Sequence, residues 1–304
     1  MVYNNAVCAL FDVLLRPFLT HAADGTPAHP VPGRKTEAVM TVTLLTHTPE
    51  PERLVAAAAK LCYSQKSVGE LMDGLTPEKT ASFVEMLAEL GHESPVEHVT
   101  FTFGIEGVSR ALLAQITRHR IASYSVQSQR YVRKGAFEYI TPPAIAADPE
   151  AEALYRQAMA DCQSVYDRLA ERLTDLQAAR LEKEGAAPDE ARKRGAKLAN
   201  EDARFVLPNA CETRMVVTMN ARSLMNFFAH RCCNRAQWEI RALAEEMLRL
   251  CRQAAPTLFR YAGPPCLRGS CPEGKMTCGH AAEMRERYKY KPEESGSTGA
   301  EQTV

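Results

Sequence analysis

The stretch RHRIASYSVQSQRY, from Arg118 to Tyr131, places three arginines, one histidine and three serines between two apolar segments, 99–105 and 137–145. Such a cationic run cannot be buried without partners, because an unpaired charge in a core is very costly. The whole chain is neutral, with 37 Lys+Arg and 37 Asp+Glu, which argues against a protein that coats nucleic acid by bulk charge. The fold must therefore keep this local cluster at a surface beside the core, where a local anion can bind.

Two interpretations of Arg118, His119 and Arg120 compete. In the first, they cap the end of a helix, where the helix dipole stabilises cations. In the second, they bind an anion, because guanidinium groups hold phosphate through paired, charge-assisted hydrogen bonds. The polar run continues to Arg130 and carries further polar side chains at Ser123, Ser125, Gln127, Ser128 and Gln129. The pattern favours the anion site, and Gln115, Gln127 and Gln129 offer amide edges to a base.

Hydrophobic periodicity predicts an α+β fold, with helices packed around a small, partly antiparallel sheet. Val99, Phe101, Phe103 and Ile105 alternate with more polar residues and indicate a half-buried strand. Further strands are expected over 40–48 and 213–220. Helices are expected over 51–64, 76–92, 109–120, 149–184, 221–232 and 234–253.

Capping residues give some of these helices defined ends. Thr76 is a candidate N-cap followed by Pro77, and Gly91 is a candidate C-terminal stop. Asp148 is the candidate N-cap of the long helix over 149–184. The charged faces and alanines of that helix indicate a surface or inter-subunit position.

Composition divides the chain into three parts. Residues 1–39 form an extension with a Pro/Gly-rich linker, 40–263 a folded domain, and 264–304 a cysteine-containing polar tail. The ten cysteines, two of them adjacent at Cys232 and Cys233, do not resemble a secreted disulfide framework. The N-terminal segment lacks a basic region, and Asp12 and Arg16 interrupt it. We therefore expect a cytoplasmic protein with no membrane segment.

A second polar cluster follows in the predicted strand and helices near the C-terminal end of the domain. Arg222 and Asn226 are four residues apart and share one helix face. Asn220 stands where a strand ends and a helix begins, a place that presents backbone donors to anions. A plain N-cap role for Asn220 is the alternative. The arginines of this cluster are Arg204, Arg214, Arg222, Arg231, Arg235 and Arg241.

The sequence holds no clear metal or dinucleotide motif. His92 and His98 lie on either side of Pro95, a spacing that does not place both rings on one helix face. The segment 269–276 resembles a phosphate-binding loop, but Met276 replaces the required Ser or Thr. No Gly-x-Gly-x-x-Gly motif occurs. The cysteines of the tail have no standard zinc spacing, so we expect no metal, with a structural zinc as the alternative; the candidate ligands are Cys266, Cys271, Cys278 and His280.

The Arg-His-Arg triplet, seven residues and then Ser128, followed by Gln-Arg-Tyr, resembles the signature of flavin-dependent thymidylate synthases. The segments GHESPVEHVTFTF and LPNACETRMVVTMNARSLMNFFAHRCCNRAQWEIR also resemble that family in order and spacing. The resemblance covers residues 40–263. It implies reductive methylation of dUMP to dTMP, with methylenetetrahydrofolate as carbon donor and FAD, reduced by NADPH, as hydride source. It also implies a homotetramer whose active sites are each built from several subunits, with FAD bound at subunit interfaces.

The resemblance also implies roles for individual residues. Matching positions for FAD contacts are His92, Ser94, Glu97, Arg118, His119, Arg120, Asn220, Arg222 and Asn226. Positions in or beside the dUMP site are Gln115, Arg118, Gln127, Ser128, Gln129, Arg130, Arg204 and Arg231. Arg231 matches the arginine thought to stabilise negative charge on the uracil ring, which makes it the catalytic candidate.

One departure from the family pattern concerns Val126. Many members carry Asn-Glu where this chain has Ser125-Val126, so only a backbone contact is left at Val126. Ser128 is expected to bind substrate rather than attack it, since reduced flavin supplies the hydride. Two rival hypotheses remain from the residues alone: a non-catalytic nucleotide- or RNA-binding module that uses the same cradle, and a zinc-dependent protein organised by the tail.

Overall fold

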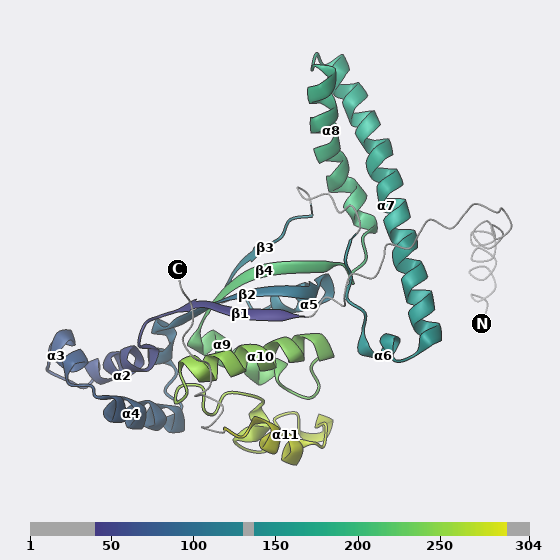
Figure 1. The fold of residues 1–304 in the computed structure, drawn as a ribbon. Helices are drawn as coiled ribbons and strands as arrows, with labels where there is room; N and C mark the ends of the chain where they lie inside the picture. The colour runs from purple at the N-terminus through teal and green to yellow at the C-terminus, as the bar shows by residue number, and fades with distance from the viewer. Residues whose placement is uncertain (1–39, 130–136, 291–304) are drawn as a thin grey trace, which may run out of the picture. The chain divides into compact units, whose positions relative to one another are not determined.

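The computed structural model describes residues 40–129 and 137–290. At its centre is a four-stranded sheet in the order β1-β2-β4-β3 (Figure 1). The strands are β1 (Thr41–His47), β2 (Thr100–Ser109), β3 (Ser123–Val126) and β4 (Glu212–Asn220). All three pairings between these strands are antiparallel. The predicted α+β fold with a small sheet is confirmed, and these pairings make the sheet antiparallel rather than mixed.

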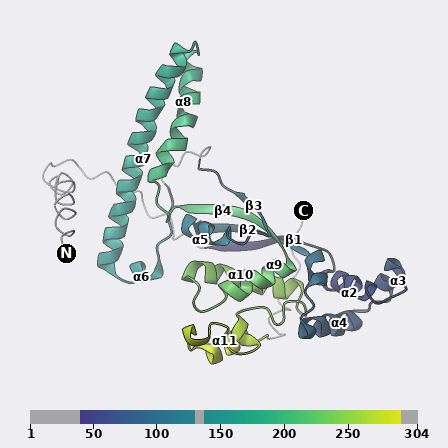
Figure 2. The same cartoon turned by 180° about the vertical axis from the view of Figure 1, so that it is seen from behind.

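β2 and β4 turn alternate residues toward the core, as the alternation in the sequence predicts. Phe101, Phe103 and Ile105 are fully buried, and so is Val217, which pairs with Phe103. The helices α9 (Ala221–Arg231) and α10 (Trp238–Ala254) cover this face of the sheet (Figures 1 and 2). Removing these large apolar side chains from water is the main force that fixes the sheet against the helices.

Further helices of the domain follow β1 and β2 in the sequence. Three of them follow β1 in sequence: α2 (Pro51–Leu61), α3 (Val68–Asp73) and α4 (Pro77–Leu90). A short 3-10 helix, η2 (Ser94–His98), then leads into β2. The helix α5 (Arg110–Ile116) follows β2 directly and buries Leu112 and Ile116.

The predicted helix caps are confirmed. The side chain of Thr76 accepts a hydrogen bond from the backbone N–H of Lys79, Pro77 is the first helical residue, and Gly91 ends α4 in the left-handed conformation, with φ 72°. Asp148 caps α7 by accepting from the backbone N–H of Glu150. These local signals were readable because a cap depends on neighbours only a few residues away.

A long helical hairpin links β3 to β4. It consists of α7 (Pro149–Lys183) and α8 (Pro188–Ala203), preceded by α6 (Pro143–Ala146) and followed by the 3-10 helix η3 (Arg204–Val206) (Figure 1). The two helices approach closely at Gly195, where a Cβ atom would stand 3.0 Å from the carbonyl oxygen of Thr174. No helix in the described part of the chain is long and apolar enough to cross a membrane.

The tail after residue 263 packs against the domain. It contains two 3-10 helices, η4 (Pro265–Leu267) and η5 (Gly274–Met276), and the helix α11 (Ala281–Tyr288). Met284 and Tyr288 of α11 are buried in the main core. The segment that resembles a phosphate-binding loop is thus a short 3-10 helix without the strand and helix that such a loop requires.

A buried carboxylate joins the start of α10 to the start of α5. Glu239 is 4% exposed and accepts hydrogen bonds from the backbone N–H and the hydroxyl of Ser109, both at 2.6 Å. The same hydroxyl accepts from the N–H of Leu112 and so caps α5. The pairing satisfies a charge that would be costly to bury alone.

Replacing Glu239 with Gln should destabilise the protein, because a neutral amide has one acceptor oxygen for two donors and points its NH2 group at a donor. We expect the free energy of unfolding to fall by about 1–3 kcal/mol. Chemical denaturation measures the change. The matched control is Glu246→Gln, which removes an exposed ion pair with Arg249 and should cost less than about 1 kcal/mol. Equal losses in the two variants would contradict this account.

Candidate active site

A cleft of about 550 Å³ opens at the end of the sheet where β2 begins and β4 ends. The loop after α5, the first turn of α9 and η2 supply its walls. The lining residues are Glu97, Arg118, His119, Arg120, Ile121, Asn220, Arg222, Ser223 and Asn226. Seven of these nine are residues that the sequence predicts as flavin contacts, so the fold brings most of that group together.

His119 forms the inner part of the cleft. The Nε–H of Arg231 donates to His119 Nε2 at 3.1 Å, and the imidazole packs edge-on against the ring of Phe227, with centroids 5.0 Å apart. Burial, followed by the charges of Arg231, His230 and Arg118, lowers the pKa of His119 to about 4. The ring is therefore neutral near pH 7 and accepts a hydrogen bond from Arg231.

Positive charge in the cleft comes from arginines rather than from the histidine. Among the described residues, Arg118 and Arg120, which line the cleft, form no ion pair with a carboxylate, and neither does Arg231, which donates to His119. Burial lowers the pKa of Arg231, and the charge of Arg118 lowers it further. Several cations that repel one another form a site prepared for an anion, because a bound anion relieves that repulsion.

Tyr124 on β3 fixes the Arg118–Arg120 loop. Its hydroxyl lies 2.7 Å from the carbonyl oxygen of Ile116 and 2.9 Å from that of His119. Burial raises the pKa of Tyr124 to about 12, so the hydroxyl stays protonated and donates. Sequence reasoning missed this role. The available signal was the alternation of residues 123–126, which form β3.

The N-cap interpretation of Asn220 is confirmed, and its role in an anion site stays a prediction. Its side chain accepts a hydrogen bond from the N–H of Ser223 at 2.8 Å and so caps α9. It also lines the cleft, together with Arg222 and Asn226 from the same helix face. Arg222 is held by two carboxylates, Glu93 at 3.2 Å and Glu97.

Several predicted residues lie outside this cleft. His92 lines a separate, mostly apolar cavity of about 220 Å³ between α4, α9 and the segment 258–268. Ser94 is exposed at the start of η2. Gln115 is turned toward the carbonyl of Ala111, at 3.5 Å. Arg204 donates to the carbonyl of Glu201 at 3.1 Å and lies over the ring of Phe205.

Residues 125–127 of the RHRIASYSVQSQRY stretch pair with β4 away from the end of the sheet where Arg118–Arg120 lie. Because β3 pairs with β4, the N–H of Gln127 donates to the carbonyl of Arg214 at 3.0 Å. Arg214 precedes Asn220 by six residues on β4, which corresponds to about 20 Å along a strand. Ser128 and Gln129 follow Gln127 and do not line the cleft. Arg130 lies outside the described residues. Within one chain, Arg118, His119 and Arg120 line the cleft, and Gln127, Ser128 and Gln129 do not.

Metal ligands do not gather in the described part of the chain, where no three His, Cys, Asp or Glu side chains are close enough to hold an ion. The backbone of Val126 pairs with Met215 in the sheet.

Comparison with known proteins identifies the family. Residues 43–257 match the family model described as thymidylate synthase complementing protein. The flavin-dependent thymidylate synthase of Clostridium tetani is 54% identical over 247 residues, which cover 81% of this chain and 96% of that protein. The chain belongs to the flavin-dependent thymidylate synthase family. The relative from Geobacter sulfurreducens is 48% identical over 252 residues, 82% of this chain and 98% of that protein.

The family assignment made from the Arg118–Ser128 motif is thus confirmed, and so is the enzyme class, a flavin-dependent methyltransferase. A solved flavin-dependent thymidylate synthase from Helicobacter pylori, complexed with FAD and dUMP, superposes with a TM-score of 0.52. The superposition covers 73% of this chain and 99% of that one at 22% identity. That likeness supports the fold of this member of the family.

The neutral state of His119 can be tested by titration. An NMR titration of histidine-labelled protein should show the imidazole of His119 protonating near pH 4, well below the usual value of about 6.5. The variant His119→Asn assigns the resonance. The unfolded chain takes up this proton first as the pH falls, so His119 should lower stability between about pH 6.5 and 4. Titration near pH 6.5 would contradict the packing described above.

Proposed function

We propose that this chain converts dUMP to dTMP by reductive methylation, with methylenetetrahydrofolate as carbon donor. The observation that supports it most directly is the arginine-lined cleft around His119, in a chain of this family. FAD supplies a hydride when NADPH has reduced it. The protein's own residues bind, orient and neutralise the ligands.

The cleft suits a flavin nucleotide. Arg118 and Arg120 have no carboxylate partners among the described residues, so their guanidinium groups are available to a pyrophosphate. The N-terminus of α9 adds a favourable helix dipole, while the N–H groups of Ala221 and Ser223 already donate to Val99 and Asn220. Amide groups at Asn220 and Asn226 are suited to the polar edge of a ring. The assigned FAD contacts remain those of the sequence: His92, Ser94, Glu97, Arg118, His119, Arg120, Asn220, Arg222 and Asn226.

Arg231 has the catalytic role, beside the substrate. Its Nε–H is bound to neutral His119, which sets the plane of the guanidinium and leaves both terminal nitrogens outside that bond. A fixed cation there stabilises negative charge that develops on the pyrimidine ring. The other dUMP contacts are Gln115, Arg118, Gln127, Ser128, Gln129, Arg130 and Arg204.

A second copy of the chain completes each site. Gln127, Ser128 and Arg204 do not line the cleft that Arg118 and His119 line, so we infer that these two groups come from different chains at one site. We assign the missing half to a partner in a homotetramer. Apolar residues exposed along one face of α7 support such association: Leu154, Val165, Leu169 and Leu176.

Other expectations stay as predictions. They are a cytoplasmic, reducing location and the division of the chain at residues 39 and 263. The two rival functions, an RNA-binding module and a zinc-dependent protein, find no support in the family match, which is to an enzyme.

The purified protein should be yellow, should bleach anaerobically with NADPH, and should release tritium from 5-tritiated dUMP. Arg231→Ala should retain FAD and lose turnover by about 10²–10³-fold, the usual cost of removing one charge-stabilising donor. Asn220→Ala should instead lose flavin on gel filtration.

Arg249→Ala, which removes an exposed ion pair on α10, is the control and should behave as wild type. Protein that stays colourless after reconstitution with FAD would contradict the function. Unchanged turnover in Arg231→Ala would contradict its catalytic role.

A further inference from the structure

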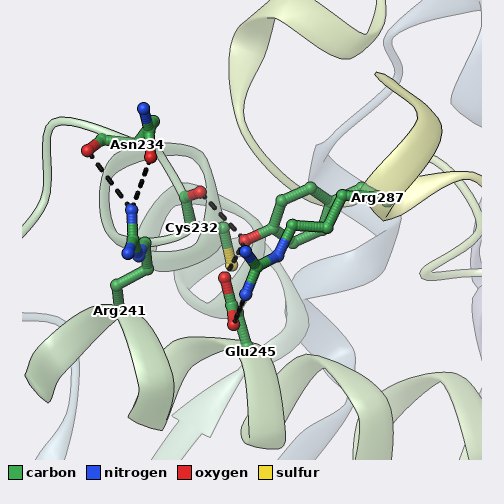
Figure 3. Close-up of polar contacts among 6 residues, drawn as sticks. Cys232, Asn234, Arg241, Glu245 and Arg287 are labelled. Atoms are coloured by element: carbon green, nitrogen blue, oxygen red, sulfur yellow. Dashed lines mark hydrogen bonds and ion pairs between the residues drawn. The ribbon is translucent and has the colours of Figure 1, made fainter. Parts of the chain in front are cut away.

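The tail beyond the matched family region contacts the turn that follows Arg231. The family match ends at residue 257, yet residues 264–290 fold back onto the turn 232–235 between α9 and α10. Figure 3 shows Cys232 and Asn234 of this turn beside Arg241 and Glu245 of α10, with Arg287 of α11 reaching Glu245. A segment beyond the residues that the family model matches thus touches the turn next to the catalytic candidate.

The central contact is made by Tyr288, the last residue of α11. Its hydroxyl lies 3.0 Å from the carbonyl oxygen of Cys232 and 2.6 Å from Glu245 Oε1. Arg287 holds the other oxygen of Glu245 at 2.6 Å. Tyr288 is only 5% exposed. Burial, followed by the neighbouring Cys232 and Glu245, raises the pKa of Tyr288, so the hydroxyl stays protonated.

The carbonyl of Cys232 belongs to the last turn of α9, where carbonyl groups have no partner within the helix. The N–H of Cys232 donates to the carbonyl of Phe228 at 2.9 Å. The Tyr288 hydroxyl therefore fixes the remaining backbone group of the residue next to Arg231.

The other residues of the turn make hydrogen bonds to the tail and to α10. Arg235 donates to Glu273 at 3.1 Å and to the carbonyl of Met276 at 2.8 Å, both in the tail. Arg241 donates to the side chain of Asn234 at 2.6 Å (Figure 3). The tail thus contacts the turn at two residues, Cys232 and Arg235. Arg241 of α10 contacts Asn234 between them.

Arg231 itself has few restraints. Among the described residues, its side chain makes one hydrogen bond, to His119, and the charge of nearby Arg118 repels it. The direction of such a guanidinium depends on a fixed backbone, because a long side chain gains freedom when its anchor moves. We propose that the C-terminal tail positions Arg231 for substrate, with Tyr288 as the positioning residue that acts through the carbonyl of Cys232. The inference rests on the proposed role of Arg231 at the dUMP site.

Tyr288→Phe tests the proposal, because it removes one hydroxyl and keeps the buried ring. In the FAD-loaded enzyme, the dissociation constant of dUMP, followed by the change in flavin absorbance, should rise about three- to tenfold, as expected for one hydrogen bond. The flavin content should not change. In an Arg231→Ala background the same substitution should change the constant by less than about twofold, since coupled residues are not additive.

Tyr261→Phe is the control, since that hydroxyl contacts only Glu85 among the described residues, at 3.3 Å, and its effect should stay within about twofold in both backgrounds. Arg287→Gln, which leaves Tyr288 in place, should weaken dUMP binding in the same direction and only when Arg231 is present. This second variant decides the matter if Tyr288→Phe does not fold.

Several results would overturn the proposal. Equal losses from Tyr288→Phe with and without Arg231 would mean that the tail supports the fold in general. If Tyr288→Phe leaves the dissociation constant of dUMP unchanged while Arg231→Ala raises it, Tyr288 does not position Arg231. The role of Arg231 in binding dUMP would still stand. An unchanged constant in Arg231→Ala would contradict the dUMP site itself, and with it this inference.

Discussion

The register of β2 against β4 determines which residues can meet in the cleft. Thr100 pairs with Asn220, so η2 before β2 and α9 after β4 lie at one end of the sheet. Ser109 pairs with Glu212 at the other end, and α5 and β3 then bring the Arg118–Arg120 loop back to the first end. A slip of one residue would turn Phe101 and Phe103 out of the core. Hydrophobic burial therefore holds the polar cleft in place.

Within the cleft, the positive charge of the arginines is available to an anion, and the histidine beside them is neutral. His119 accepts a hydrogen bond from Arg231 and adds no charge of its own near pH 7. Tyr124 holds the loop from one side, and the tail holds the turn after α9 from the other. Tyr124 donates to backbone carbonyls of one cationic segment, and Tyr288 shares its hydroxyl proton between Glu245 and the carbonyl of Cys232 beside the other. A ligand meets arginines whose backbones are already fixed, which lowers the entropic cost of binding.

The structural features that could be predicted from the sequence are those that depend on residues close together in the chain. Alternation marked β2, and local chemistry marked the caps at Thr76 and Asp148. Sequence reasoning missed α8, whose face toward α7 is built from small residues around Gly195 and shows no apolar period. It also missed β3, which consists mostly of Ser and Tyr. The separation of Ser128 from Arg118 was hidden for another reason, because strand pairing with β4 involves residues about ninety positions away and leaves no local signal.

The central claim is that two chains share each site, and mixing two inactive variants tests it most directly. Asn220→Ala damages the cleft, and Arg204→Ala damages the group that lies outside it. Each variant alone should be nearly inactive. Co-expressed, they should form hybrids in which some sites contain only intact halves, so tritium release from 5-tritiated dUMP should rise well above either parent. Hybrids seen by native mass spectrometry that show no more activity than the parents would contradict the account.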